Sequence, residues 1–238
     1  MFIFRLLVRF AIAIDKKPTS WYVSGDGDIC LRTLPKIPSR VKPRLLEAAL
    51  WVIRAKGYSG TTVDDLCQAA GVTKGGFFHH YESKEALAIE AAKYFSAMAD
   101  GLFLQAEYRR LTDPVDRLLG YVEFRKAILT GTLPEFTCLL GTMVQETYET
   151  HPAIREACEE CLGINVAMVQ EDVAEAMRRY EVVGEWSAES LAAYTQAVIQ
   201  GAFILAKAKG GAGVAADCLD HLHRYLKMLF IPSKFKET

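Results

Sequence analysis

Residues 61–84 read TTVDDLCQAAGVTKGGFFHHYESK, and this stretch predicts two short helices joined by a tight turn. Thr62 is a good N-cap for the first helix, and Asp65 lies three residues later, where its carboxylate can reach back to the cap. Gly71 can adopt the left-handed conformation that ends a helix, and Thr73 can cap the helix that follows. Two short helices joined by a Gly-containing turn form a helix-turn-helix, whose second helix lies in the major groove of DNA.

The composition of the second helix, residues 74–81, favours contact with DNA over a purely structural role. Gly75 and Gly76 each cost a helix up to about 1 kcal/mol relative to Ala, and a structural helix gains nothing from them. A helix whose backbone must approach phosphates and bases does gain, because glycine has no side chain to keep them apart. The helix also carries large groups that can donate or stack, namely Phe78, His79 and His80. The alternative is a small surface helix whose glycines occur by chance.

A longer stretch, residues 44–90, resembles the N-terminal domain of the TetR family of transcriptional regulators. It reads RLLEAALWVIRAKGYSGTTVDDLCQAAGVTKGGFFHHYESKEALAIE. The matching pieces are the AA of the first helix, GY before the threonines, TTV, the AGVTKG turn, the aromatic-His run and SKEAL. The sequence departs from the family at Phe78, where many members carry Tyr, and at Tyr81, where Phe is usual. We expect Phe77 and Tyr81 to pack inward and Phe78 and His79 to point outward.

The resemblance implies an all-α protein: an N-terminal three-helix helix-turn-helix DNA-binding domain followed by a helical ligand-binding and dimerisation domain. We place the first domain at residues 39–85 and the second at residues 86–238. The resemblance puts His79, His80 and Lys84 against the DNA backbone, and plain exposure of the two histidines is the alternative. The complete set of predicted DNA-binding residues is Thr62, Thr73, Lys74, Gly75, Gly76, Phe78, His79, His80 and Lys84.

Charge is distributed unevenly along this chain of 238 residues, whose net charge is −1. Residues 1–85 carry 13 Lys or Arg and 8 Asp or Glu, a net of +5, whereas the remainder carries 15 and 21, a net of −6. A basic N-terminal part and an acidic remainder fit a nucleic-acid contact at one end. The six cysteines are scattered without disulfide or zinc spacing, so we expect free thiols in the cytoplasm and no bound metal.

Residues 1–38 do not resemble the family. Arg5 and Arg9 interrupt the apolar run at residues 1–14, which therefore lacks the order of a signal peptide and is too short to span a membrane. Residues 15–40 contain Gly, Pro and Ser without any period, which predicts coil. We favour a disordered extension, and a basic arm that touches DNA is the alternative.

Apolar periodicity predicts helices, and no strand, in the rest of the chain. The helices expected outside the opening stretch cover residues 43–56, 83–110, 114–130, 136–150, 152–180, 188–209 and 214–230. The buried stripe predicted for the helix at 152–180 is Ile154, Ala157, Cys161, Ile164 and Met168. Small residues at 188–209 would let two copies of the chain pair as a four-helix bundle, and packing within one chain is the alternative. These small residues are Ala192, Ala193, Ala197, Gly201 and Ala202.

The resemblance also implies a mostly apolar cavity between the long helix at 83–110 and the helices behind it. The predicted effector-binding residues are Phe95, Met98, Tyr121, Phe124, Cys138, Met143 and Met168 in the wall, with Tyr148 and His151 as polar anchors. For each of them the alternative is an ordinary place in the core. Cys138 lies in TCLLGTM, which resembles a segment in a subgroup of the family whose members include sensors of small electrophiles. Because its neighbours are apolar, we favour an inert buried thiol.

We therefore interpret the sequence as that of a ligand-responsive transcriptional repressor that binds a palindromic double-stranded DNA operator as a homodimer. A small-molecule effector would release the operator, and no cofactor or membrane is implied. The alternatives are an enzyme that uses the cavity and an interaction protein that has lost DNA binding. No Ser-His-Asp order, paired carboxylates or nucleotide-binding glycine loop in the sequence supports an enzyme.

Overall fold

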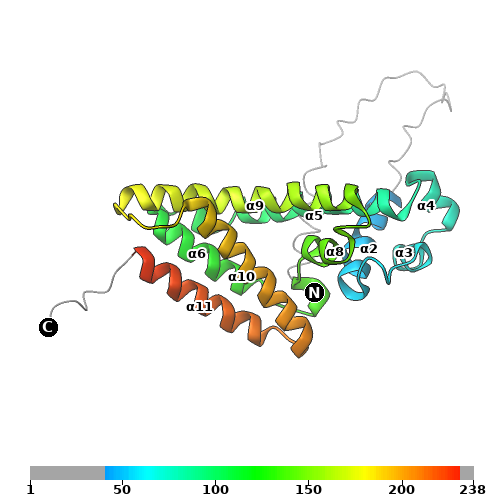
Figure 1. Cartoon of the computed structure of the whole chain (residues 1–238). Coiled ribbons are helices and arrows are strands. Elements are labelled where there is room, and N and C mark those ends of the chain that lie inside the picture. Colours follow the sequence, from blue (N-terminus) through cyan, green and yellow to red (C-terminus); the bar gives the residue numbers. More distant parts are fainter. Residues whose placement is uncertain (1–40, 231–238) are drawn as a thin grey trace, which may run out of the picture.

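The computed structural model describes residues 41–230, and every regular element in that range is helical (Figure 1). The all-α prediction is confirmed, whereas the expectation for residues 1–38 lies outside the described residues. Within 41–230 no helix has the length and apolar character needed to cross a membrane. A 3-10 helix, η1 (Glu107–Arg110), separates α5 from α6. The α-helices are α2 (Val41–Lys56), α3 (Val63–Ala70), α4 (Lys74–His80), α5 (Lys84–Leu104), α6 (Pro114–Ala127), α7 (Leu133–Phe136), α8 (Leu139–Thr147), α9 (Pro152–Arg179), α10 (Ala188–Lys209) and α11 (Gly213–Phe230).

Helices α2, α3 and α4 form the predicted helix-turn-helix unit with the predicted caps. Thr62 Oγ1 accepts a hydrogen bond from the Asp65 N–H at 3.1 Å, and Asp65 Oδ2 accepts one from the Thr62 N–H at 2.9 Å. Gly71 ends α3 at φ 61° and ψ 44°. Thr73 Oγ1 accepts from the Gly76 N–H at 3.1 Å and so begins α4. A side-chain N-cap of this kind stabilises a helix by about 1 kcal/mol, so local chemistry fixes the turn between α3 and α4.

Aromatic side chains at α4 divide between the core and the surface as predicted. Phe77 is fully buried and Tyr81, which follows α4, is 4% exposed. Their ring centroids lie 6.0 Å apart. Phe78 is 55% exposed, and His79 is exposed as well. The exposed pair therefore stands on a helix that Phe77 fixes to the core.

Helix α5 ends at Leu104, earlier than the predicted end near residue 110. No Gly or Pro follows Leu104 to mark this end in the sequence. The helix ends there because of tertiary packing. Tyr108 of η1 turns inward and is only 6% exposed. Its ring lies 6.0 Å from that of Tyr121 and 5.8 Å from that of Phe124, both on α6. Burial of this aromatic cluster outweighs the small helical preference of the intervening residues.

The helix predicted at 136–150 is present but shorter: α8 spans Leu139–Thr147, and Phe136 belongs instead to the end of the preceding short helix, α7. Thr137 between them is extended, at φ −81° and ψ 159°. The guanidinium of Arg54, on α2, donates to the carbonyls of Glu135 and Thr137 at 3.4 and 3.3 Å. Carbonyls held by a distant arginine do not need to continue a helix, and the sequence around Thr137 gives no sign of that partner.

Helix α9 buries a stripe slightly different from the predicted one. Ile154, Ala157 and Cys161 are buried as expected. Ile164 is 47% exposed, whereas Asn165 is only 8% exposed and occupies the next inward position. Counted from Cys161, the inward position is i+4 (Asn165) and not i+3 (Ile164), and both spacings fit a helical turn of 3.6 residues. The sequence did not indicate this, because Asn165 is polar and Ile164 is apolar.

In the bundle behind the helix-turn-helix unit, α5 runs beside α9, α10 packs against α11, and α6 contacts both α9 and α11 (Figure 1). A buried carboxylate connects α9 to η1 and α6. Asp172 of α9 is 6% exposed, and its two oxygens lie 2.7 Å from Arg117 Nε and 2.7 Å from Arg109 Nη1. These ion pairs hold η1 and α6 against α9.

Candidate DNA-binding surface and effector pocket

Most of the side chains predicted to bind DNA lie on α4 or at the start of α3, with access to solvent. Gly76 and His80 are half-buried. The exposed members of the set are Thr62, Thr73, Lys74, Gly75, Phe78 and His79. Together they give α4 an outward face that is free of contacts with the bundle, although their contact with DNA stays a prediction.

The two glycines of α4 are not required by packing inside the protein. A Cβ atom on Gly75 would lie 3.9 Å from its nearest neighbour, Thr73 Oγ1, and one on Gly76 would lie 3.4 Å from the same atom. Neither glycine has a positive φ. Packing inside the protein therefore does not account for glycine at these positions, and their approach to DNA stays a prediction.

Lys74 forms an exposed ion pair at this face. Its Nζ lies 2.9 Å from Asp64 Oδ1, and the two side chains are 62% and 68% exposed. The hydrogen bond to Asp64 raises the pKa of the Lys74 ammonium. Exposed ion pairs contribute little to stability, so Lys74 can exchange Asp64 for a DNA phosphate at small cost.

Lys84 differs from the other predicted DNA-binding residues, because its ammonium is directed into the protein. Nζ donates to the carbonyls of Tyr58 and Thr61 at 2.9 and 2.8 Å and lies 4.1 Å from the centroid of the Tyr58 ring. These bonds join the start of α5 to the turn before α3. They give Lys84 a structural role, and its contact with DNA remains a prediction from the resemblance alone.

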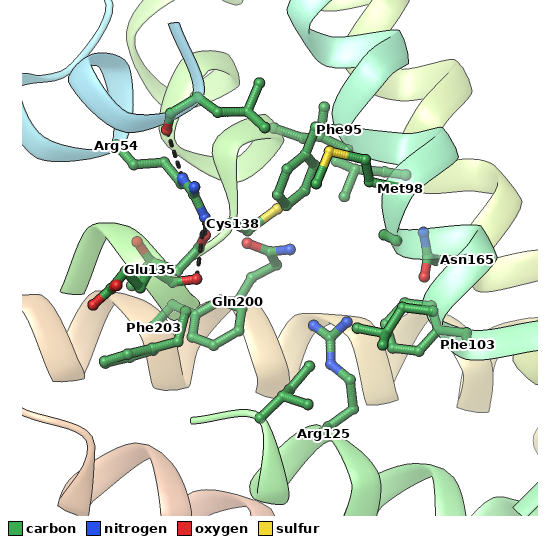
Figure 2. A pocket seen from close by; sticks show the side chains of 18 of the residues that line it. Arg54, Phe95, Met98, Phe103, Arg125, Glu135, Cys138, Asn165, Gln200 and Phe203 are labelled. Carbon is green, nitrogen blue, oxygen red and sulfur yellow. Dashed lines mark hydrogen bonds between the residues drawn. The ribbon is translucent and has the colours of Figure 1, made fainter. Parts of the chain in front are cut away.

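A cavity of about 120 Å³ lies between α2, α5 and the helices behind them (Figure 2). Three of the predicted effector-binding residues line it: Phe95, Met98 and Cys138. The remaining apolar lining comes from Leu50, Ala99, Leu102, Phe103, Ile128, Phe136, Leu140, Leu162 and Phe203. The polar lining consists of Arg54, Arg125, Glu135, Thr137, Asn165, Gln196 and Gln200.

The other six predicted effector residues do not line this cavity. Tyr121 and Met143 are buried in the core, and Phe124 and Met168 are partly buried residues that pack against the same hydrophobic cluster. Tyr148 is 59% exposed. His151 lies against the Tyr58 ring, with 5.1 Å between centroids. Helical periodicity identifies buried faces, but it cannot tell which part of a buried face borders a cavity.

The polar residues of the lining were not predicted from the sequence. For one of them, Arg54, the sequence does contain a signal. Arg54 follows Leu50 by one helical turn, so a charged side chain continues the apolar stripe of α2. Arg54 is 5% exposed, and burial lowers the pKa of its guanidinium to about 10. Nε donates to the Leu50 carbonyl at 2.6 Å, and the guanidinium carbon lies 5.6 Å from the Phe95 ring. A residue of the helix-turn-helix unit thus forms part of the cavity wall.

Arg125 reaches into the cavity from α6 (Figure 2). Its guanidinium carbon lies 5.2 Å from the ring centroid of Phe103, 5.7 Å from that of Phe203 and 5.9 Å from that of Tyr121. Within residues 41–230, two further polar atoms of the lining are buried without a hydrogen-bond partner, Asn165 Oδ1 and Gln200 Nε2. Buried polar atoms are normally paired, so these two are available to a ligand in the cavity.

Cys138 caps α8 and separates this cavity from a second one. Its Sγ accepts a hydrogen bond from the Gly141 N–H at 3.5 Å, and the residue is 9% exposed. The second cavity has a volume of about 200 Å³ and shares Thr137, Cys138, Gln200 and Phe203 with the first. The predicted burial of the thiol is confirmed, and its position at both cavities leaves it within reach of a bound small molecule.

Comparison with known families accounts for both parts of the structure. The family described as "Bacterial regulatory proteins, tetR family" matches residues 45–91, which cover the helix-turn-helix unit. The domain described as "Transcriptional regulator LmrA/YxaF-like, C-terminal domain" matches residues 114–214. The chain belongs to the TetR family. It is a transcriptional regulator, as the resemblance of residues 44–90 had implied.

Individual TetR family proteins align with most of the chain. The transcriptional repressor DhaR from Mycobacterium sp. strain GP1 is 28% identical over 167 residues, which cover 70% of this chain and 82% of DhaR. A TetR family regulator from Agrobacterium tumefaciens has the same fold, with a TM-score of 0.71 and 17% identity over 79% of this chain and 98% of its own. A cysteine mutant of the regulator CifR, solved with 26 base pairs of operator DNA, gives a TM-score of 0.66 and 16% identity over 76% and 94%.

Proposed function

We propose that this protein is a repressor that binds a palindromic operator as a homodimer and releases it when a small molecule occupies the cavity. The observation that carries this proposal is the position of Arg54. It belongs to α2 of the DNA-binding unit, yet its side chain lines the cavity and binds the turn between α7 and α8. A molecule in the cavity therefore touches the DNA-binding unit directly.

Helix α5 supplies a second mechanical connection between the two sites. Its N-terminus is held by Lys84 to the turn before α3, and about three turns further on it lines the cavity with Phe95 and Met98. A ligand that shifts α5 or Arg54 changes the orientation of α4. Coupling of this kind requires only that the ligand prefer one of two arrangements.

The proposed dimer face lies on α10 and α11. Ala192 and Ala202 are buried within the chain, whereas Ala193 and Ala197 are exposed and Gly201 is half-buried. Large apolar side chains are exposed on the same two helices: Tyr194, Ile204, Leu205, Tyr225 and Met228. Exposed apolar groups of this size favour a subunit interface, and a two-fold dimer would match a two-fold symmetric operator.

Operator binding tests the proposal directly. Fluorescence anisotropy with labelled duplexes from the DNA upstream of the gene should show one saturable high-affinity site that a random duplex does not compete for. Sedimentation velocity should show that the free protein is a dimer. The complex with one operator duplex should contain one dimer. Failure of every upstream duplex to compete better than random DNA, at low and at moderate salt, would overturn the repressor assignment.

A further inference from the structure

The cavity contains a cation that no anion neutralises within residues 41–230. Arg109 and Arg117 both pair with Asp172. Arg54 donates to three backbone carbonyls. Arg125 lies over aromatic rings and makes no hydrogen bond or ion pair with the described part of the chain. Its donors are therefore free to bind a group that enters the cavity.

Glu135 is the one carboxylate that residues 41–230 place in the lining, and it is already engaged. Its Oε2 accepts from the Thr132 N–H at 2.6 Å and from the Thr132 hydroxyl at 2.9 Å. These bonds lower the pKa of Glu135 and hold its charge at the N-terminus of α7. With two arginines and one committed carboxylate, the cavity favours an anion over a neutral or cationic ligand.

The unpartnered atoms add a specific pattern. In the described part of the chain, Gln200 Nε2 is a donor without an acceptor, and Asn165 Oδ1 is an acceptor without a donor. Asn165 is only 8% exposed, so water does not satisfy it from the surface. A carboxylate can accept from both Arg125 and Gln200, and a hydroxyl on the same ligand can donate to Asn165.

Size and apolar lining define the rest of the ligand. The cavity of about 120 Å³ is close to the roughly 150 Å³ of an engineered protein cavity that holds benzene. Its walls include the rings of Phe95, Phe103, Phe136 and Phe203. A single planar ring fits this volume and these walls, since aromatic side chains pack favourably around another ring.

We propose that the effector is a monocyclic aromatic carboxylic acid, bound as its anion with the carboxylate on Arg125 and a ring hydroxyl on Asn165. The inference rests on the proposed function, because it names the class of small molecule that the repressor senses. Arg125 also links the ligand to α6, so that an anion draws α6, α9 and α10 together around the ring.

Calorimetric titration of the full chain with charged and neutral molecules of equal size tests this inference. The probes are benzoate, 3-hydroxybenzoate and 4-hydroxybenzoate, with benzamide and phenol as uncharged counterparts, each raised to about 10 mM so that a Kd of about 1 mM is detected. We expect at least one hydroxybenzoate to bind tenfold or more tightly than benzamide. The inference is overturned if no carboxylate binds, or if the uncharged molecules bind equally well.

Variants assign the binding to the named residues. Arg125→Gln should weaken hydroxybenzoate binding at least tenfold, because a charge-assisted bond is lost, whereas Arg125→Lys should retain part of it. Asn165→Leu should reduce the affinity for the hydroxybenzoate to that for benzoate. Arg110→Gln is the matched control, since Arg110 is exposed and pairs with Glu107 outside the cavity. Unchanged affinity in Arg125→Gln would refute the proposal, and thermal melts of each variant identify any loss of folding.

Operator anisotropy on the same samples separates the two proposals. The ligand assignment alone is overturned in two cases. In the first, wild-type protein binds operator but no carboxylate. In the second, it binds operator, and Arg125→Gln binds the carboxylate as well as wild type does. Protein that binds a hydroxybenzoate through Arg125 but no operator overturns the repressor assignment and leaves the ligand class standing. Hydroxybenzoate should release operator from wild-type protein at concentrations that leave the Arg125→Gln complex intact.

Discussion

The guanidinium of Arg54 donates to the carbonyl of Thr137 at 3.3 Å, across 83 positions of sequence. This bond joins α2 of the DNA-binding unit to the point where the wall of the cavity passes from α7 to α8. The extended conformation of Thr137 depends on it, since the carbonyl would otherwise need a helical or solvent partner. The two functional regions of the protein therefore meet at this buried contact.

Replacing Arg54 should uncouple the cavity from DNA binding. Arg54→Met removes the guanidinium that donates to the carbonyl of Thr137 and to that of Leu50, so we expect a loss of about 1–3 kcal/mol in the free energy of unfolding. At temperatures where the variant remains folded, it should bind operator but respond to ligand several-fold less. Arg44→Met is the control on the same helix, because Arg44 donates only to Gly71 within the DNA-binding unit. Denaturant melts and anisotropy measure both effects, and a normal ligand response would argue against Arg54 as the connection.

Lys84→Ala separates a structural role from a DNA contact. The Thr61 carbonyl loses its Lys84 donor and the Tyr58 carbonyl keeps only the Thr61 N–H, so the thermal midpoint should fall by an amount that corresponds to about 1–3 kcal/mol. If the ammonium also touches a phosphate, the salt dependence of operator binding will decrease by about one counterion. We expect the first effect, measured by calorimetry. A variant with unchanged stability and a reduced salt slope would restore the role implied by the family.

Lys74→Ala should weaken binding to operator and to random DNA to a similar extent. The Lys74 side chain is 62% exposed, and its removal breaks only the ion pair with Asp64, which is exposed as well. The stability of the fold should therefore change little. The slope of log affinity against log salt should decrease by about 1 if one phosphate contact is lost. Lys209→Ala, at the exposed end of α10, is the control for loss of charge alone. Equal affinities and slopes for both variants would remove Lys74 from the DNA interface.

Gly201→Glu tests the dimer face without disturbing the fold. No atom lies within 4 Å of a Cβ placed on Gly201, so the monomer should tolerate the larger side chain. Light scattering should show monomers, and operator affinity should fall sharply because each monomer holds only one half-site. Gly163→Glu on α9 is the matched control, since its Cβ is equally unobstructed. A dimeric Gly201→Glu protein would place the interface elsewhere.

The cysteines should react with an alkylating agent in the order of their exposure and pKa. Burial raises the pKa of the Cys158 thiol to about 12, so only about one molecule in ten thousand is thiolate at pH 8. Among the cysteines of residues 41–230, Cys218 is half-buried and the others are buried, so Cys218 should be modified before Cys158, which should stay unmodified in folded protein. Peptide mass spectrometry measures the order. Early modification of Cys158 would show that α9 opens.

Cys138→Ser should preserve both operator binding and release by ligand. Serine is a favoured N-cap, and its hydroxyl can accept the Gly141 N–H that the Cys138 sulfur accepts now. We therefore expect a similar or slightly higher thermal midpoint. If alkylation of Cys138 alone abolishes operator binding in wild-type protein, and the serine variant escapes that loss, the protein senses electrophiles through this thiol.

The helix-turn-helix unit could be read from the sequence because its determinants are local. Thr62, Gly71 and Thr73 define the ends of α3 and α4 through bonds to residues at most four or five positions away. The break at Thr137 and the end of α5 at Leu104 depend instead on Arg54 and on the burial of Tyr108. Arg54 lies 83 positions before Thr137, and Tyr108 is buried against Tyr121 and Phe124 of the next helix, so periodicity carries no information about these partners.

The cavity was only partly predictable for the same reason. Phe95 and Met98 were identified because α5 was expected to border it, whereas Tyr121 and Met143 proved to be core residues. The polar lining escaped because Arg125 and Asn165 look like ordinary surface residues within helices. Their burial follows from how α6, α9 and α10 meet, which sequence alone does not give.

The place of Leu50 and Arg54 in the cavity wall bears on the construction of hybrid regulators. An exchange of the segment before residue 85 is intended to transfer operator preference from one repressor to another. In this protein the exchanged segment would carry two cavity residues with it. A hybrid would then inherit altered inducer preference along with its new operator, unless positions 50 and 54 were returned to Leu and Arg.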